Sequence, residues 1–284
     1  MPAFLWYAAC TLSELFDILD VMQTVTSKDG TKIAYDKIGS GPTVILTTGA
    51  TGTRSYDEEL AKLLSSNFTV YYFDRRGRGD STDTLPYSVE KEIEDIEALI
   101  DEAGGYVYLY GISSGGCLAL EAASKLDKKV TKLALYEAPY DESEEGKKKW
   151  KEYTTNLKEL ISTGDRSGAI ELFMKFVGVP DEMLEGMKNS PMWPGMEQVA
   201  PTLVYDAACI GDDRTVPVER AAKITARTLV MDGGASLQIM PFMHASAEKI
   251  AKAIPNAKRQ TLEGQTHNVD MRVLAPALTE FFKE

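Results

Sequence analysis

The chain has 284 residues, of which 44% are hydrophobic and 26% charged, a composition typical of globular proteins and unlike disordered, collagen-like or coiled-coil chains. Its formal net charge of −12 would repel nucleic-acid phosphates and the anionic face of a bilayer, so we expect no nucleic-acid or membrane partner. No apolar run approaches the roughly 18 residues that a membrane-spanning helix requires.

The cysteines and the first basic residue bear on location. Cys10, Cys117 and Cys209 are odd in number and have no spacing typical of a zinc site or a disulfide framework. No basic residue precedes Lys28, whereas a secretory signal begins with positive charge. We therefore expect a cytoplasmic protein without a metal. An oligomer is possible, but nothing in the sequence indicates one.

Residues 1–21 are interpreted as an N-terminal extension. Thr11 and Glu14 have the spacing of a helix capping box, and apolar residues follow at helical spacing, which predicts a short amphipathic helix. Such a helix is either a flap or dimer contact, or a segment upstream of a natural start at Met22. We favour the second interpretation, because a strand pattern begins directly afterwards.

From residue 23 onward, short apolar and β-branched runs alternate with segments of helical periodicity. The expected strands cover 23–38 (two strands joined by a turn), 43–47, 69–73, 106–110, 133–136, 228–231 and 258–262. The expected helices cover 56–65, 88–103, 118–126, 242–254 and 272–283. Continuous apolar strands are typical of a sheet buried on both faces. The alternation predicts an α/β fold, with a mostly parallel sheet and helices on both faces.

The alternation stops after Pro139. Between 141 and 220 the chain shows helical and loop-like sequence without a strand pattern. We therefore predict one α/β core made of residues 22–138 and 221–284, with a helical cap inserted at 139–220.

A candidate nucleophile lies between an expected strand and an expected helix. Residues 111–115 read Gly-Ile-Ser-Ser-Gly, which matches G-x-S-x-G and follows the run 106–110 directly. A strand–turn–helix context of this kind is what a nucleophile elbow requires, because the strained turn lifts the hydroxyl of Ser113 clear of the sheet. The following helix presents its positive N-terminal end to developing negative charge.

Two further motifs complete a resemblance to the α/β-hydrolase family, in its serine esterase and haloperoxidase-like branch. Residues 73–81 resemble the D-x-R-G-x-G-x-S stretch of that family, and residues 263–267 resemble its G-x-x-H end. The resemblance covers 22–284 and implies the α/β-hydrolase fold. Arg75, Arg76 and Arg78 have two interpretations, a phosphate site or a structural cluster paired with Asp74 and Asp80, and we favour the structural one.

The base would be one of two histidines. A serine hydroxyl is a weak nucleophile until a base removes its proton. His267 follows the last expected strand, where the family places its catalytic histidine. His244 falls in the first turns of an expected helix and is interpreted as a surface or hydrogen-bonded histidine.

The acid departs from the usual family position. Aligning 228–230 with the family's penultimate strand puts that position on Ser236, while Asp232 comes four residues earlier. A variation of the family pattern places the acid after the preceding core strand, where this chain has Glu137. Catalytic groups collect at that edge of open α/β sheets. We favour Glu137 as the acid, with Asp232 as the alternative.

The oxyanion hole would use two main-chain N–H groups. One belongs to Ser114, the residue after the nucleophile, and the other to Ala50 in the loop after the strand 43–47. The family commonly has His-Gly in that loop, whereas this chain has Thr48-Gly49.

The resemblance implies a serine hydrolase that cleaves a small-to-medium hydrophobic ester, thioester or lactone through an acyl-enzyme, without cofactor or metal. The same triad serves cofactor-free haloperoxidases, C–C hydrolases and aminopeptidases, so these activities stay open. A rival class is a non-catalytic ligand receptor on a hydrolase fold, favoured by the displaced acid and the missing loop histidine.

Overall fold

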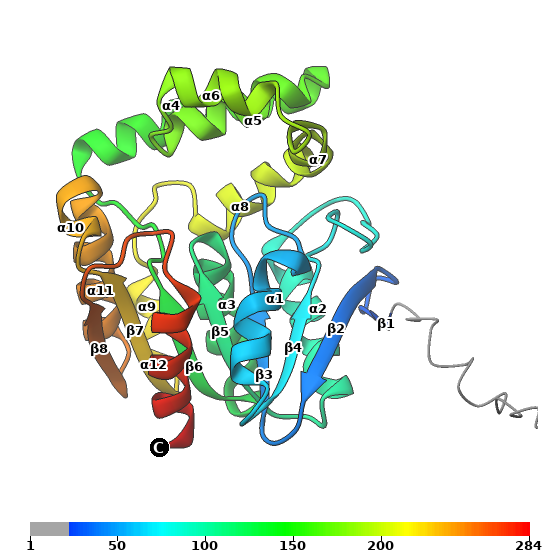
Figure 1. Cartoon of the computed structure of the whole chain (residues 1–284), viewed down its shortest axis with the longest axis vertical. Coiled ribbons are helices and arrows are strands. Elements are labelled where there is room, and N and C mark those ends of the chain that lie inside the picture. Colours follow the sequence, from blue (N-terminus) through cyan, green and yellow to red (C-terminus); the bar gives the residue numbers. More distant parts are fainter. Residues whose placement is uncertain (1–22) are drawn as a thin grey trace, which may run out of the picture.

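The computed structural model describes residues 23–284. The helix predicted within residues 1–21, and both interpretations of that segment, lie outside the described residues. Strands and helices alternate through the core as the sequence predicts (Figure 1). The nucleophile-elbow helix begins at Ser114, directly after the turn, and not at residue 118 as periodicity indicated.

The strands and helices have the following bounds. The strands are β1 (Gln23–Thr26), β2 (Lys32–Gly39), β3 (Thr43–Thr47), β4 (Thr69–Phe73), β5 (Val107–Ile112), β6 (Val130–Tyr136), β7 (Arg227–Gly233) and β8 (Ala257–Leu262). The core helices are α1 (Arg54–Leu64), α2 (Val89–Glu102), α3 (Ser114–Leu126), α9 (Val218–Ala221), α10 (Ser236–Ile239), α11 (Pro241–Ala253) and α12 (Met271–Lys283). Between β6 and β7 lie α4 (Glu144–Thr163), α5 (Arg166–Phe176), α6 (Asp181–Lys188), α7 (Trp193–Val199) and α8 (Leu203–Ile210). Single 3-10 turns cover Asp127–Lys129 and Ala200–Thr202.

The strands of the described chain form one sheet in the order β1-β2-β4-β3-β5-β6-β7-β8. Strand β2 runs antiparallel to β1 and β4, and all later neighbours are parallel. The mostly parallel α/β sheet predicted from the sequence is therefore confirmed. Because β3 to β8 run in one direction, the residues that follow their carboxyl ends gather at one edge.

Helices cover both faces of the sheet. Helices α1 and α12 pack together on one face, over a buried cluster that includes Leu60, Tyr110 and Leu278. Helices α2, α3, α9 and α11 cover the other face. Most β-branched and aromatic residues of the central strands are buried between these layers, as a doubly covered sheet requires.

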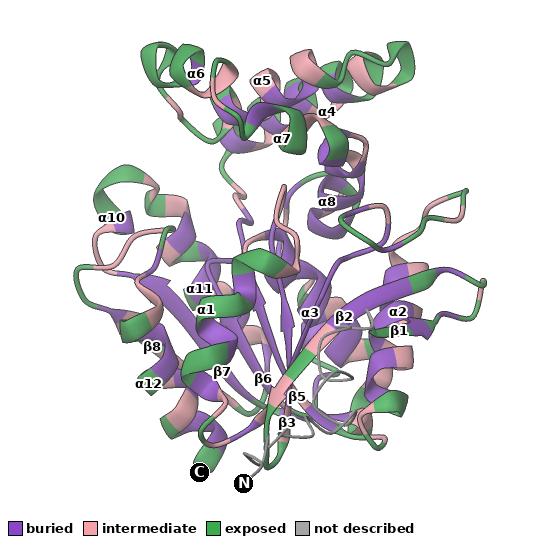
Figure 2. Cartoon of the chain, turned by 45° about the vertical axis from the view of Figure 1, so that its right-hand side comes forward, coloured by how far each residue is buried: buried purple, intermediate pink, exposed green. Residues whose placement is uncertain are grey.

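Helices α4 to α8, which we call the cap helices, lie above the carboxyl edge of the sheet (Figures 1 and 2). Trp150, Leu157 and Leu203 are buried, and they belong to the same apolar cluster as the α3 side of the core. The cap helices are therefore anchored on that side, although the predicted limits of the insertion at 139 and 220 stay a prediction. Within residues 23–284, no helix combines the length and apolar character needed to cross a membrane.

Candidate active site

Ser113 occupies a strained turn between β5 and α3. Its φ is +57° and its ψ is −132°, a conformation that costs a non-glycine residue roughly 1–3 kcal/mol. The turn is held because the Ser113 N–H donates to the Tyr136 carbonyl at 3.0 Å. Gly115 permits close packing, since a Cβ there would lie 2.3 Å from the Thr47 carbonyl oxygen. The structure thus has the local geometry of a nucleophile elbow at Ser113.

Glu137 directly follows β6, the strand next to β5, at the same height in the sheet as Ser113. Ile112 pairs with Tyr136 in the sheet, so Ser113 and Glu137 are each one residue beyond a paired position. The Glu137 side chain is buried; its Oε1 accepts from the Gly233 N–H at 2.8 Å, and its Oε2 lies 2.8 Å from Nδ1 of His267. Burial raises the pKa of Glu137, but hydrogen bonds from His267 and the Gly233 N–H lower it below its ordinary value.

His267 lies in the loop between β8 and α12 and is partly exposed. The position of the preceding residue, Thr266, is fixed because the Tyr136 hydroxyl donates to its carbonyl at 2.7 Å. With Nδ1 facing the Glu137 carboxylate, the proton resides on Nδ1 and Nε2 is the nitrogen that can accept a proton. The structure therefore joins Glu137 and His267 as an orienting carboxylate and a candidate base.

Asp232 and His244 form a separate pair. Asp232 is fully buried within β7, and its Oδ2 lies 2.8 Å from Nδ1 of His244 in α11. Its Oδ1 accepts from Arg259 at 2.8 Å and from the Thr261 hydroxyl at 3.1 Å. The alternative acid is thus occupied by His244, Arg259 and Thr261 rather than placed against His267.

The two candidate oxyanion donors belong to segments next to Ser113. Ser114 is the first residue of α3, where backbone N–H groups have no acceptor inside the helix. Ala50 follows Gly49, whose added Cβ would lie 2.9 Å from the Ser113 Cβ and 3.4 Å from its Oγ. The loop after β3 therefore passes directly against the candidate nucleophile.

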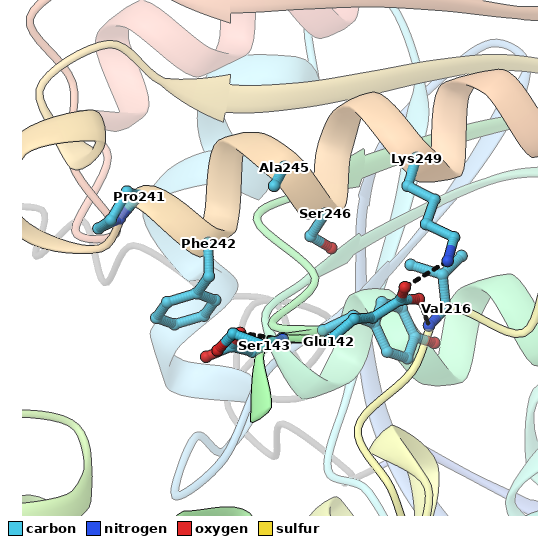
Figure 3. A pocket seen from close by; sticks show the side chains of 10 residues that line it. Glu142, Ser143, Val216, Pro241, Phe242, Ala245, Ser246 and Lys249 are labelled. Carbon is cyan, nitrogen blue, oxygen red and sulfur yellow. Dashed lines mark hydrogen bonds and ion pairs between the residues drawn. The ribbon is translucent and has the colours of Figure 1, made fainter. Parts of the chain in front are cut away.

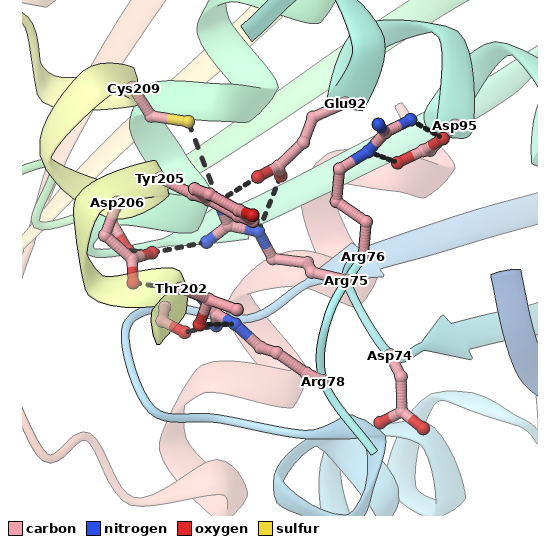
Figure 4. A network of polar contacts seen from close by, with 12 residues as sticks. Asp74, Arg75, Arg76, Arg78, Glu92, Asp95, Thr202, Tyr205, Asp206 and Cys209 are labelled. Atoms are coloured by element: carbon pink, nitrogen blue, oxygen red, sulfur yellow. Dashed lines mark hydrogen bonds and ion pairs between the residues drawn. The ribbon is translucent and has the colours of Figure 1, made fainter. Parts of the chain in front are cut away.

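The arginine cluster is buried and structural, but its expected partners were wrong. Asp74 and Asp80 both pair with Arg54 of α1. The partners of the three arginines come from other parts of the chain. Arg75 contacts Glu92 and Asp206, Arg76 contacts Asp95, and Arg78 contacts Asp206 and Thr202 (Figure 4). Arg76 also contacts Asp29. Sequence reasoning missed Asp206, because no motif marks it and it lies 92 residues from its hydrogen-bond partner Ser114.

A cavity of about 450 Å³ lies apart from these residues, where α11 meets the segment that leads from β6 to α4 (Figure 3). Glu142 bridges its walls, because Oε1 accepts from the Val216 N–H at 3.0 Å and Oε2 pairs with Lys249. None of the candidate catalytic or oxyanion residues lines this cavity. It belongs to the junction of core and cap rather than to the site around Ser113.

Comparisons with known proteins bear on the family and the fold. A model of the alpha/beta hydrolase family matches residues 44–278. An alpha/beta hydrolase from Sphaerobacter thermophilus, known as a crystal structure, is 47% identical with a TM-score of 0.82, covering 92% of this chain and 100% of its own. An esterase from Exiguobacterium antarcticum is 22% identical, covers 93% of this chain and 100% of its own, and shares the fold with a TM-score of 0.71.

A proline iminopeptidase from Pestalotiopsis fici is 28% identical over an alignment of 268 residues, which covers 85% of this chain and 91% of its own. The family model spans most of the sheet, both flanking layers and the cap helices. The resemblance inferred from three short motifs is therefore confirmed along the described chain, and the protein belongs to the α/β-hydrolase family.

Proposed function

We propose that this protein is a serine hydrolase that cleaves a small-to-medium hydrophobic ester, thioester or lactone through an acyl-enzyme. The observation that carries the proposal is the strained turn at Ser113 together with the hydrogen bond between the buried Glu137 and His267. A serine hydroxyl becomes a nucleophile when a base removes its proton and a carboxylate orients that base.

In the proposed reaction Ser113 Oγ attacks the substrate carbonyl carbon while Nε2 of His267 takes its proton. The new C–O bond forms a tetrahedral intermediate, whose oxyanion accepts hydrogen bonds from the Ser114 and Ala50 N–H groups. As the bond to the leaving alcohol breaks, His267 gives the proton to that alcohol. Water then attacks the acyl carbon while His267 takes its proton. The bond to Ser113 Oγ breaks, the carboxylic acid is released and His267 returns the proton to Ser113. Glu137 stabilises the imidazolium in both halves without taking a proton.

Cleavage of N-terminal amino acids from peptides is the second candidate, because a relative matched over most of the chain is a proline iminopeptidase. Both reactions use the same attacking group and differ in the leaving group, an amine instead of an alcohol. Hydrolysis rates for p-nitrophenyl esters of increasing acyl length and for proline p-nitroanilide would separate the two. C–C cleavage, haloperoxidase activity and a cytoplasmic location stay predictions from the sequence.

Labelling with a fluorophosphonate probe, followed by peptide mass mapping, tests the proposal. We expect rapid modification of Ser113 in the wild type, none in Ser113→Ala, and slow modification in His267→Ala. His244→Ala is the matched control and should label at the wild-type rate, because His244 pairs with Asp232 instead. Failure of the folded wild type to label would contradict the proposal and favour the non-catalytic receptor.

A further inference from the structure

A carboxylate of the cap contacts the residue that follows the candidate nucleophile. Asp206 lies in α8 and is 4% exposed. Its Oδ1 accepts from the Ser114 hydroxyl at 2.7 Å and from Arg75 at 2.6 Å, and its Oδ2 accepts from Arg78 at 2.7 Å. The cap is therefore hydrogen-bonded to the residue whose N–H forms one half of the proposed oxyanion hole.

Arg78 extends this contact to the other half of the hole. Its Nη1 donates to the Gly49 carbonyl at 2.7 Å and, more weakly, to the Gly52 carbonyl at 3.3 Å. The Gly49 carbonyl and the Ala50 N–H belong to one planar trans peptide, in which the two groups point in opposite directions. Fixing the carbonyl toward Arg78 therefore fixes the direction of the Ala50 N–H.

The network is charged and buried, so its members depend on one another. Arg75 and Arg78 are each 1% exposed, and their charges are balanced by Glu92 and Asp206 (Figure 4). Burial raises the pKa of Asp206, but the Arg78 and Arg75 guanidiniums lower it below its ordinary value. Removing the Asp206 charge would leave Arg78 buried without a carboxylate. The hydrogen bonds from Arg78 to the loop after β3 would then weaken.

We infer that Asp206 is a positioning residue for the oxyanion hole: one cap carboxylate aligns Ser114 directly and Ala50 through Arg78, so that the hole is complete only when α8 is docked on the core. The inference rests on the proposed acyl transfer. The cap would then support the chemical step as well as cover the site. A purely structural Asp206 would affect stability alone.

The chain offers a matched control for this test. Arg76 is buried like Arg78, and it binds both oxygens of the buried Asp95 at 2.7 Å. That pair has no contact with Ser114 or with the loop 49–52. Asp206→Asn and Asp95→Asn each remove a carboxylate from a buried arginine. Arg76 keeps a second carboxylate, Asp29, and only Asp206→Asn touches the proposed hole.

The experiment compares kcat, KM and urea unfolding for wild type, Asp206→Asn and Asp95→Asn with the fastest p-nitrophenyl ester. It adds the inhibition constant of an alkylboronic acid, which forms a tetrahedral adduct on a reactive serine. We expect Asp206→Asn to lower kcat by about 10- to 100-fold with little change in KM, and to weaken boronate inhibition by a similar factor, since loss of a whole oxyanion donor costs roughly 100- to 1,000-fold. Asp95→Asn should change kcat by less than about twofold.

Ser114→Ala provides a second variant in case Asp206→Asn does not fold. It removes the hydroxyl link to Asp206 but keeps the backbone N–H and both arginine pairs, and we expect kcat to fall about 5- to 10-fold at unchanged KM. Equal kcat values for Asp206→Asn and Asp95→Asn would overturn this inference but not the proposed function. If Asp206→Asn is unfolded, a wild-type kcat for Ser114→Ala would overturn the inference in the same way. A wild type without ester turnover or labelling at Ser113 would overturn the proposed function as well.

Discussion

Oε2 of Glu137 lies 2.8 Å from Nδ1 of His267, although 130 residues separate them along the chain. Asp232 and His244 form a second pair at the same distance, 12 residues apart. The position of Ser113 distinguishes the two pairs, because its N–H bonds to the Tyr136 carbonyl, directly before Glu137. The long-range pair is thus tied to the nucleophile turn, whereas the short-range pair joins β7 to α11.

Replacing Glu137 by Gln should lower kcat about 1,000- to 10,000-fold with little change in KM. The amide keeps the shape of the side chain and can still accept from the Gly233 N–H, but it cannot stabilise an imidazolium or fix the tautomer of His267. Steady-state kinetics on the fastest ester, with circular dichroism to verify folding, would measure this effect.

Asp232→Asn is the paired control. It removes a buried carboxylate from Arg259 and His244, so we expect lower stability but a kcat within a few-fold of the wild type. If Asp232→Asn produced the large loss of kcat and Glu137→Gln did not, the assignment of the acid would be wrong.

Gly49→Ala should reduce kcat on the order of 100-fold while the protein stays folded. The new Cβ would lie 2.9 Å from the Ser113 Cβ, so either the serine or the loop carrying Ala50 must shift. A misplacement of about 1 Å at a reacting group can lower the rate about 100-fold. Kinetics and the rate of fluorophosphonate labelling should fall together.

Gly186→Ala serves as the control for that substitution. Gly186 lies inside α6, and apart from its chain neighbours and the helix's own backbone no described residue comes within 4 Å of an added Cβ. Alanine should therefore stabilise the fold by about 0.5–1 kcal/mol and leave kcat unchanged. A similar loss of kcat in both variants would exclude the contact with Ser113 as the cause.

Because of Asp57, the free energy of unfolding should fall as the pH rises from 3.8 to about 7. It is fully buried in α1, neither oxygen has a hydrogen-bond partner among the described residues, and burial raises its pKa to about 7. Because the folded-state pKa exceeds the unfolded one, the folded protein binds the proton more tightly, and that stabilisation disappears as the pH passes the folded pKa. The full effect is roughly 4 kcal/mol.

Urea unfolding at pH 5 and pH 8 would test this prediction. Asp57→Asn should remove roughly 2–3 kcal/mol of the difference between the two pH values, because the amide does not titrate. Glu58→Gln alters the next position, on the exposed side of the same helix, and should retain the wild-type difference. Identical pH dependence in wild type and Asp57→Asn would refute the prediction.

Tyr136→Phe should lower the free energy of unfolding by about 1 kcal/mol and reduce kcat several-fold. Its hydroxyl holds the Thr266 carbonyl, next to His267, and a hydrogen bond of this kind contributes about that much. Tyr110→Phe is the matched control: that buried hydroxyl has no partner within the described chain, so its removal should be neutral or stabilising. Equal effects in both variants would show that the Thr266 contact does not position the histidine.

The sequence by itself determined the local features. Alternating buried strands and helices predicted the sheet, because burial on both faces demands continuous apolar runs. The motif at 111–115 predicted the turn at Ser113, because that spacing of glycine and serine serves a strained strand-to-helix connection. The strands that Glu137 and His267 follow, together with the family resemblance, predict them as acid and base.

Only the tertiary structure decided which distant groups meet. Asp74 and Asp80 were expected to neutralise the arginine cluster because they are close in sequence, but both pair with Arg54. Asp206 reaches Arg75 and Arg78 from the cap, more than 120 residues away. Periodicity and spacing describe one segment at a time, whereas the partner of a buried charge depends on which segments pack together and exclude water around it.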